Sequence, residues 1–123
     1  MQAVEINAGA WYLRALRGDD RLSDVPALTD LGLSDPAGYI AGADRPDADG
    51  DVRCVWAVCI PTTGELIALI GVTGREGGDG ALCGRARSGY AGALADVAGP
   101  VRRFAEQALS VTVGDAPIRP ETP

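Results

Sequence analysis

Cys54-Val-Trp-Ala-Val-Cys-Ile60, Pro61-Thr-Thr-Gly64 and Glu65-Leu-Ile-Ala-Leu-Ile-Gly-Val72 follow one another in the middle of the chain. The two outer runs are apolar and rich in β-branched residues, and the short run between them holds turn-forming residues. This pattern predicts a β-hairpin in which Gly64 supplies the positive φ that a four-residue loop needs. Because both runs are apolar at odd and even positions alike, we expect both faces of the hairpin to be covered.

The segment before the hairpin predicts one strand and two helices. The strand is centred on Trp11–Leu16, where apolar side chains fall on both faces. Leucine and valine recur at helical spacing over Arg21–Leu33, which predicts a helix. Its N-cap is expected in Gly18-Asp19-Asp20, and its end is expected at Gly32. Asp35 and the proline after it predict the start of a second helix that ends at Ala43. Residues 44–51 hold four aspartates and predict an exposed loop.

The segment after the hairpin predicts a connection, a short strand and a long helix. Thr73–Gly80 is polar and glycine-rich, and the apolar triplet Ala81–Cys83 is the core of a strand confined to Gly80–Gly84. Apolar residues then recur at steps of three and four, which predicts a helix; they are Leu94, Val97, Ala98, Val101, Ala105 and Ala108. Gly99-Pro100 interrupts the pattern and predicts a kink or two shorter helices.

A short strand at Ser110–Val113 completes the predicted elements. Pro117–Pro123 predicts a disordered tail, so we expect one domain over residues 1–115 with a tail over residues 116–123. The order of elements favours an α/β or α+β fold, a mixed sheet with helices on both faces.

Composition excludes several kinds of chemistry. The chain has 123 residues and a net charge of −6, and all eleven basic residues are arginine. Without histidine there is no Ser-His or Cys-His pair and no His-ligated metal, and without lysine there is no Schiff base. The acidic balance argues against binding to nucleic acid or to an anionic membrane. No zinc or redox spacing is present, so we expect no metal site and reduced thiols in a cytoplasmic protein. Cys54 and Cys59 are predicted to point to opposite faces of one strand.

Three stretches, taken in order, resemble the GNAT-type N-acyltransferases, particularly the bacterial branch that modifies protein N-termini and small amines. They are Tyr12-Leu-Arg-Ala-Leu-Arg-Gly-Asp-Asp20, Trp56-Ala-Val-Cys-Ile-Pro-Thr-Thr-Gly-Glu-Leu66, and Ser88-Gly-Tyr-Ala-Gly-Ala-Leu94 with Phe104-Ala-Glu-Gln-Ala-Leu109. The resemblance covers most of residues 11–113. It implies a GNAT-like sheet, an acetyl-CoA or other acyl-CoA cofactor, and transfer of the acyl group to a small-molecule or peptide amine.

The third stretch also has a physical reading of its own. A glycine-containing turn that opens a helix presents main-chain N–H groups and the positive end of the helix dipole to an anion. The predicted pyrophosphate cradle is Ser88, Gly89, Tyr90 and Ala91, with Arg85 and Arg87 as charged donors and a main-chain donor near Leu82 and Cys83. The family pattern places Gln or Arg where this chain has Ala86, so the match is imperfect. An ordinary helix start is the alternative reading.

The resemblance also indicates where this chain differs from the family. Its fourth strand is predicted to be cut short, and the elements that follow the long helix in family members, which complete the acceptor site, are missing. We therefore expect an exposed sheet edge covered by a second copy of the chain or by a partner protein. No general base is assigned, since Glu65 and Tyr90 are weak candidates. An inactive scaffold that binds a protein or a small ligand is the alternative function, and an enzyme of another class stays open.

Overall fold

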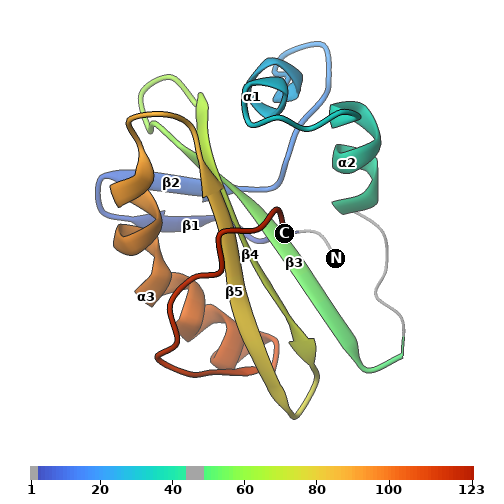
Figure 1. The fold of residues 1–123 in the computed structure, drawn as a ribbon, viewed down its shortest axis with the longest axis vertical. Helices are drawn as coiled ribbons and strands as arrows, with labels where there is room; N and C mark the ends of the chain where they lie inside the picture. The colour runs from blue at the N-terminus through green and yellow to red at the C-terminus, as the bar shows by residue number, and fades with distance from the viewer. Residues whose placement is uncertain (1–2, 44–48) are drawn as a thin grey trace.

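The computed structural model describes residues 3–43 and 49–123. Its six-stranded sheet has the order β1-β2-β3-β4-β5-β6, in which β1 to β5 are antiparallel neighbours and β6 runs parallel to β5. Figure 1 shows α3 on one side of the sheet and α1 and α2 on the other. The elements are β1 (Ile6–Ala8), β2 (Trp11–Arg14), α1 (Val25–Asp30), α2 (Pro36–Ala43), β3 (Asp51–Cys59), β4 (Leu66–Arg75), β5 (Asp79–Ala86), α3 (Ala91–Ala108) and β6 (Thr112–Val113). The predicted mixed sheet with helices on both faces is confirmed.

The central hairpin is the core of the molecule. β3 and β4 pair over their whole length, and the main-chain N–H of Gly64 donates to the carbonyl of Ile60 at 2.8 Å. Gly64 has φ 75°, as the turn requires. Trp56 is fully buried under α3, where its ring meets Phe104 edge to face at 5.4 Å. The opposite face packs against α1 and α2 through a second cluster that includes Leu69. Both faces of the hairpin are therefore covered, as the sequence predicts.

The two strand cysteines lie on opposite faces, as predicted. Cys54 belongs to the cluster beneath α3, and Cys59 belongs to the cluster beneath α1 and α2. Cys54, Cys59 and Cys83 are all buried and reduced. Burial raises the pKa of the Cys59 thiol to about 12, so this side chain behaves as a small apolar core residue.

The N-terminal third differs from the prediction at two places. β1 pairs with β2 through a tight turn in which Gly9 has φ 64°, and this strand was not predicted. α1 begins at Val25 rather than at Arg21, because the side chain of Asp19 accepts hydrogen bonds from the main chain of the two residues that follow Asp20 and holds them in a turn. α2 has the predicted bounds, and Asp35 accepts a hydrogen bond from the N–H of Gly38 at 3.2 Å. Of the predicted acidic loop, residues 44–48 lie outside the described residues.

The prediction of a shortened strand at Gly80–Gly84 is wrong. β5 runs over Asp79–Ala86, and the turn before it is confined to residues 76–78. Two glycines permit this length, because Gly74 and Gly80 face each other in the ladder. A Cβ atom added to Gly74 would lie 2.7 Å from the Cα of Gly80, so the two strands approach too closely there for larger side chains.

α3 is one helix of 18 residues that continues through Pro100. Of the two predicted alternatives, the two shorter helices are therefore wrong, and the kink stays a prediction. The apolar side of α3 is the predicted one except at its end: Val97, Val101 and Ala105 are fully buried against the sheet, whereas Ala108 is exposed. This packing offsets the hydrogen bond that the proline removes, a cost of about 3 kcal/mol in a helix interior.

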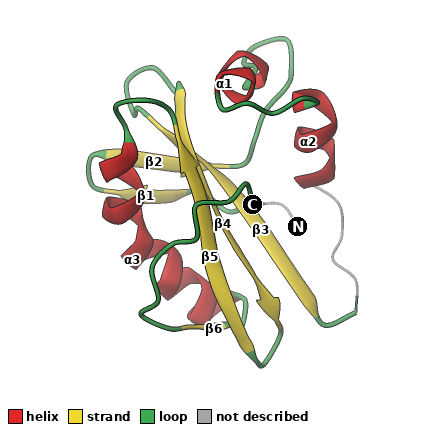
Figure 2. Ribbon diagram, in the orientation of Figure 1, coloured by secondary structure: helices red, strands yellow, loops and turns green. Residues whose placement is uncertain are grey.

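The predicted disordered tail lies on the sheet. Figure 2 shows the segment after β6 as a loop that crosses β5. Arg119 forms a parallel bridge with Cys83: its N–H donates to the carbonyl of Leu82 at 2.9 Å, and its carbonyl accepts from the N–H of Gly84 at 2.9 Å. Ile118 packs against the core beneath α3. The segment therefore covers part of the sheet edge at β5. The expected second copy of the chain or partner protein stays a prediction.

Candidate functional site

The predicted cradle lies at the surface between the end of β5 and the start of α3. Ser88 and Gly89 are exposed, and Gly89 has φ 89°. The N–H of Arg87 donates to the carbonyl of Ile67 at 2.9 Å, which fixes the start of the turn to β4. Tyr90 is the N-cap residue, and its side chain provides no capping hydrogen bond. The turn therefore presents main-chain groups to solvent at the positive end of an 18-residue helix.

Tyr90 is held both by the turn and by β2. Its main-chain N–H donates to the carbonyl of Arg87 at 3.0 Å, so this N–H of the predicted cradle is already bonded. Its ring meets Trp11 edge to face, with 6.2 Å between the ring centroids. The indole N–H of Trp11 in turn donates to a carboxylate oxygen of Asp96 on α3 at 3.1 Å. These contacts fix the first turns of α3 against β2, so the backbone that follows Gly89 is positioned before any ligand arrives.

Arg87 is engaged by two carboxylates. Its guanidinium donates to Glu65 at 2.8 Å and to Asp30 at 2.5 Å, and also to the carbonyl of Leu66 at 3.2 Å. The hydrogen bond that Arg87 donates to Glu65 is the largest of the effects that raise the pKa of Arg87. Both partners come from distant elements, since Asp30 ends α1 and Glu65 precedes β4. A surface hollow joins these three side chains to Ser88 and Tyr90. The structure therefore brings Arg87 to the turn together with two carboxylates, which exceed its single positive charge by one negative charge.

Arg85 does not join the turn. Its guanidinium donates to the hydroxyl of Thr122 at 3.2 Å, and it lines a different hollow with Tyr39 and Asp35 of the α2 region. Ala91 is exposed at the first position of α3. Of the predicted residues, the structure brings together Arg87, Ser88 and Tyr90 and places Arg85 on the side of α1 and α2.

Leu82 and Cys83 are buried in β5, with exposed fractions of 2% and 6%. Burial raises the pKa of the Cys83 thiol. On the outer edge of this part of β5, the carbonyl of Leu82 and the N–H of Gly84 are bonded to Arg119. The main-chain donor of Gly84, next to the predicted donor near Leu82 and Cys83, is therefore already occupied.

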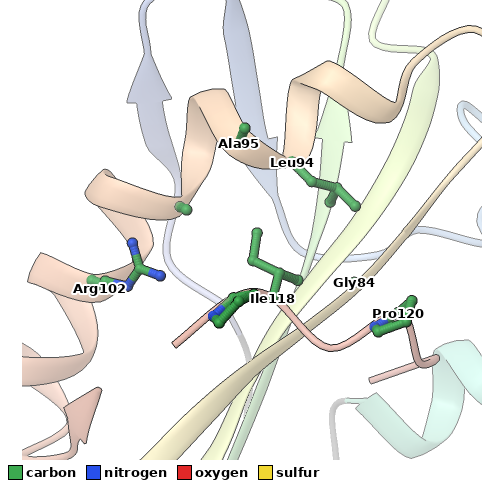
Figure 3. A pocket seen from close by; sticks show the side chains of 8 residues that line it. Gly84, Leu94, Ala95, Arg102, Ile118 and Pro120 are labelled. Carbon is green, nitrogen blue, oxygen red and sulfur yellow. The ribbon is translucent and has the colours of Figure 1, made fainter. Parts of the chain in front are cut away.

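A cavity of about 470 Å³ lies between α3 and the segment that follows β6. Figure 3 shows Leu94 and Ile118 on opposite sides of it, with Gly84 behind and Arg102 at one end. Prolines 117 and 120 form the outer rim. Sequence reasoning missed this cavity because one of its walls was predicted to be disordered.

A buried ion pair lies beside the hairpin turn between β3 and β4. Arg14 donates to both carboxylate oxygens of Asp24, at 2.9 and 2.8 Å, and to the carbonyl of Gly64 at 2.9 Å. Arg14 is 5% exposed and Asp24 is 2% exposed. The signal for this pair was present in the sequence: Arg14 falls on the face of β2 that Tyr12 and Leu16 bury, and a buried cation needs an acidic partner.

The described residues contain no group of three metal-ligating side chains close enough to hold an ion. No helix within the described part of the chain has the length and hydropathy needed to cross a membrane. Comparisons of the chain with protein-family models, with curated proteins and with solved structures found no match.

Proposed function

We propose that this protein binds an acyl-CoA, with the pyrophosphate on the turn at Ser88–Ala91, and that it transfers the acyl group to the amine of a small molecule or peptide. The chemistry of the ligand motivates this assignment. A pyrophosphate accepts hydrogen bonds from clustered main-chain N–H groups, and the dipole of a long helix favours its negative charge. A reducing cytoplasmic compartment, where we place the protein, is consistent with three reduced thiols.

The openness of the turn is the observation that carries the proposal. A Cβ atom added to Gly89, or to Gly92 in the first turn of α3, would meet no atom within 4 Å. The space in front of the main chain is therefore free, and phosphate oxygens can approach it closely. No acidic side chain lies in the first turn of α3, so no charge within the first turn itself opposes the positive end of the helix dipole.

The ion pairs of Arg87 with two carboxylates bear on how tightly the turn would bind a phosphate. A phosphate at the turn would compete with Asp30 and Glu65 for the guanidinium, whose distances to these carboxylates are 2.5 and 2.8 Å. Both carboxylates are more than half exposed, so water screens the two ion pairs and the competition costs little. We therefore expect binding that weakens as salt rises.

A second candidate function is a non-catalytic scaffold that binds a protein or a small ligand. It is favoured by the partly occupied edge of β5, where Arg119 bonds the carbonyl of Leu82 and the N–H of Gly84. Acyl transfer needs a free donor for the developing oxyanion, and no residue is assigned as the base. Catalysis on this chain would therefore require the segment around Arg119 to leave β5, whereas binding at the turn would not.

Substitution of Gly89 tests the proposal. We expect Gly89→Val to weaken acetyl-CoA binding by about tenfold or more, because the side chain fills the space that phosphate oxygens need. Gly77→Val is the matched control, since Gly77 also has a positive φ, 77°, in an exposed turn with no atom within 4 Å of an added Cβ. Both substitutions strain the backbone alike, but only Gly89 precedes α3.

Isothermal titration calorimetry with acetyl-CoA measures the outcome. Binding by the wild-type protein and by Gly77→Val, together with its loss in Gly89→Val, supports the cradle. Equal affinities of the two variants would contradict it, and an absence of heat with all three proteins would leave the scaffold as the better description.

A further inference from the structure

The cavity beneath the C-terminal segment exists because that segment bows away from the sheet. Its register with β5 changes from Thr112 opposite Asp79 to Arg119 opposite Cys83. The chain advances seven residues while β5 advances four, so three extra residues leave the sheet between these two pairs. The space behind them is not filled, because α3 presents the small side chains of Ala95 and Ala98 there.

The walls of the cavity are apolar. Leu94, Ala95 and Ala98 of α3 line one side, and Ile118 with its flanking prolines lines the other. Proline has no N–H and a fixed φ, so Pro117 and Pro120 form a stiff rim without a main-chain donor. Gly84 forms the floor, where an added Cβ atom would lie 2.9 Å from the side chain of Leu94. The volume of about 470 Å³ lies within the range of sites for small molecules.

One cation faces this apolar space. Arg102 reaches from α3 toward the segment that carries Ile118 (Figure 3). One of its terminal nitrogens, Nη2, donates to the carbonyl of Ala116 at 3.0 Å. Its Nε atom is buried and has no hydrogen-bond partner among the described residues. No carboxylate of the residues that the structure describes forms an ion pair with Arg102, so its charge has no counter-ion among them.

We propose that this cavity binds a small carboxylic acid with an apolar body, such as a medium-chain fatty acid or an aromatic acid, with its carboxylate on Arg102. The apolar part displaces water from Leu94 and Ile118, and the carboxylate pairs with the guanidinium of Arg102 through its terminal nitrogens, because Nε itself is covered by protein atoms. A neutral apolar molecule would fill the space but would leave the charge unpaired. The proposal is independent of acyl-CoA binding at Ser88–Ala91, because the two sites use different residues.

Octanoate and its neutral analogue octanamide test the site in the full-length protein. We expect ¹H–¹⁵N NMR titration with octanoate to shift the amide signals of Gly84, Leu94 and Ile118 in a saturable way. Octanamide, which has the same chain without the charge, should bind about tenfold more weakly. Equal binding of the two probes, or shifts confined to residues outside the cavity, would overturn the proposal.

Two variants, each with a matched control, test separately the charge of Arg102 and the free volume of the cavity. Arg102→Gln should reduce octanoate affinity about tenfold and leave octanamide affinity unchanged, whereas Arg103→Gln, on the exposed side of α3, should change neither. Ala95→Trp should block both probes by filling the rim, and Ala108→Trp, exposed on the same helix outside the cavity, should block neither. Wild-type affinity for octanoate in Arg102→Gln or in Ala95→Trp would refute the site.

Discussion

A single ion pair, Arg14 with Asp24, joins three segments at one end of the molecule. Arg14 ends β2, Asp24 precedes α1, and the guanidinium also bonds the carbonyl of Gly64 in the hairpin turn. The carboxylate of Asp24 accepts a further hydrogen bond from the N–H of Arg17 at 2.7 Å. Because both side chains are almost fully buried, neither is solvated well enough to lose its partner without cost.

Removal of Asp24 is therefore predicted to destabilise the fold strongly. We expect Asp24→Ala to lower the free energy of unfolding by about 3–5 kcal/mol, because it leaves the Arg14 charge buried and unpaired. Asp51→Ala is the matched control, since Asp51 pairs with Arg75 at 2.7 Å while both side chains are more than half exposed. That change should cost at most about 1 kcal/mol. Urea unfolding of both variants measures the difference, and equal costs would show that burial does not govern the pair.

Cys59 predicts how stability depends on pH. Burial raises the pKa of its thiol from 9.0 to about 12 in the folded state. The folded protein thus favours the neutral thiol, so this contribution to stability is complete below pH 9 and is lost as the pH rises toward 12. The free energy of unfolding of the wild-type protein should fall more steeply over this window than that of Cys59→Ala. Parallel curves for the two proteins would contradict the assignment of the titration to Cys59.

The C-terminal segment is the element whose role differs most from the prediction. It is exposed along most of its length, yet it is tied to the sheet by two main-chain hydrogen bonds at Arg119 and by the side chain of Ile118. The carbonyl of Pro123 adds a contact, since it accepts from Nε of Arg53 at 3.0 Å. With so few buried groups, this element should open more easily than the strands beneath it.

Proline at position 119 tests this attachment. Arg119→Pro removes the N–H that donates to Leu82, and we expect the segment to detach and the amide of Gly84 to lose its protection against hydrogen exchange. Arg119→Ala keeps the main-chain donor and should retain that protection. Hydrogen–deuterium exchange followed by NMR distinguishes the two variants. Unchanged protection of Gly84 in Arg119→Pro would mean that the segment does not depend on this bond.

Local patterns explain which elements could be predicted from the sequence. The hairpin strands and α3 have long apolar patterns, and α2 begins at the characteristic pair Asp35-Pro36. β1 has only three residues, which are too few for a period to be recognised. The true ends of β5 were hidden because the glycines that allow strands to approach also resemble turn residues.

The candidate site was predictable in the same limited way. The turn at Ser88–Ala91 follows from a glycine before a helical pattern, and the structure places it at the surface. The partners of Arg87 lie 22 and 57 residues away, so no local pattern could reveal them. The apolar cavity depends on the path of a segment that has few apolar residues of its own.

At the scale of the whole molecule, one sheet carries two distinct surfaces on its α3 side. The turn at Ser88–Ala91 lies where β5 ends and α3 begins, and the apolar cavity lies farther along α3 beneath residues 117–120. The C-terminal segment closes part of the β5 edge from within the chain. The proposed phosphate site therefore uses the main chain of the turn, whereas residues 117–120 form one wall of the cavity.

The most direct test of the proposed acyl-CoA site is an NMR titration of the ¹⁵N-labelled full-length protein with acetyl-CoA. We expect saturable shifts of the amide signals of Ser88, Gly89 and Gly92, and an affinity that falls as salt rises, because their N–H groups would bond the pyrophosphate. Gly77, in the other exposed turn with a positive φ, should not shift. Unshifted signals at Ser88–Gly92 with millimolar acetyl-CoA would contradict the central claim.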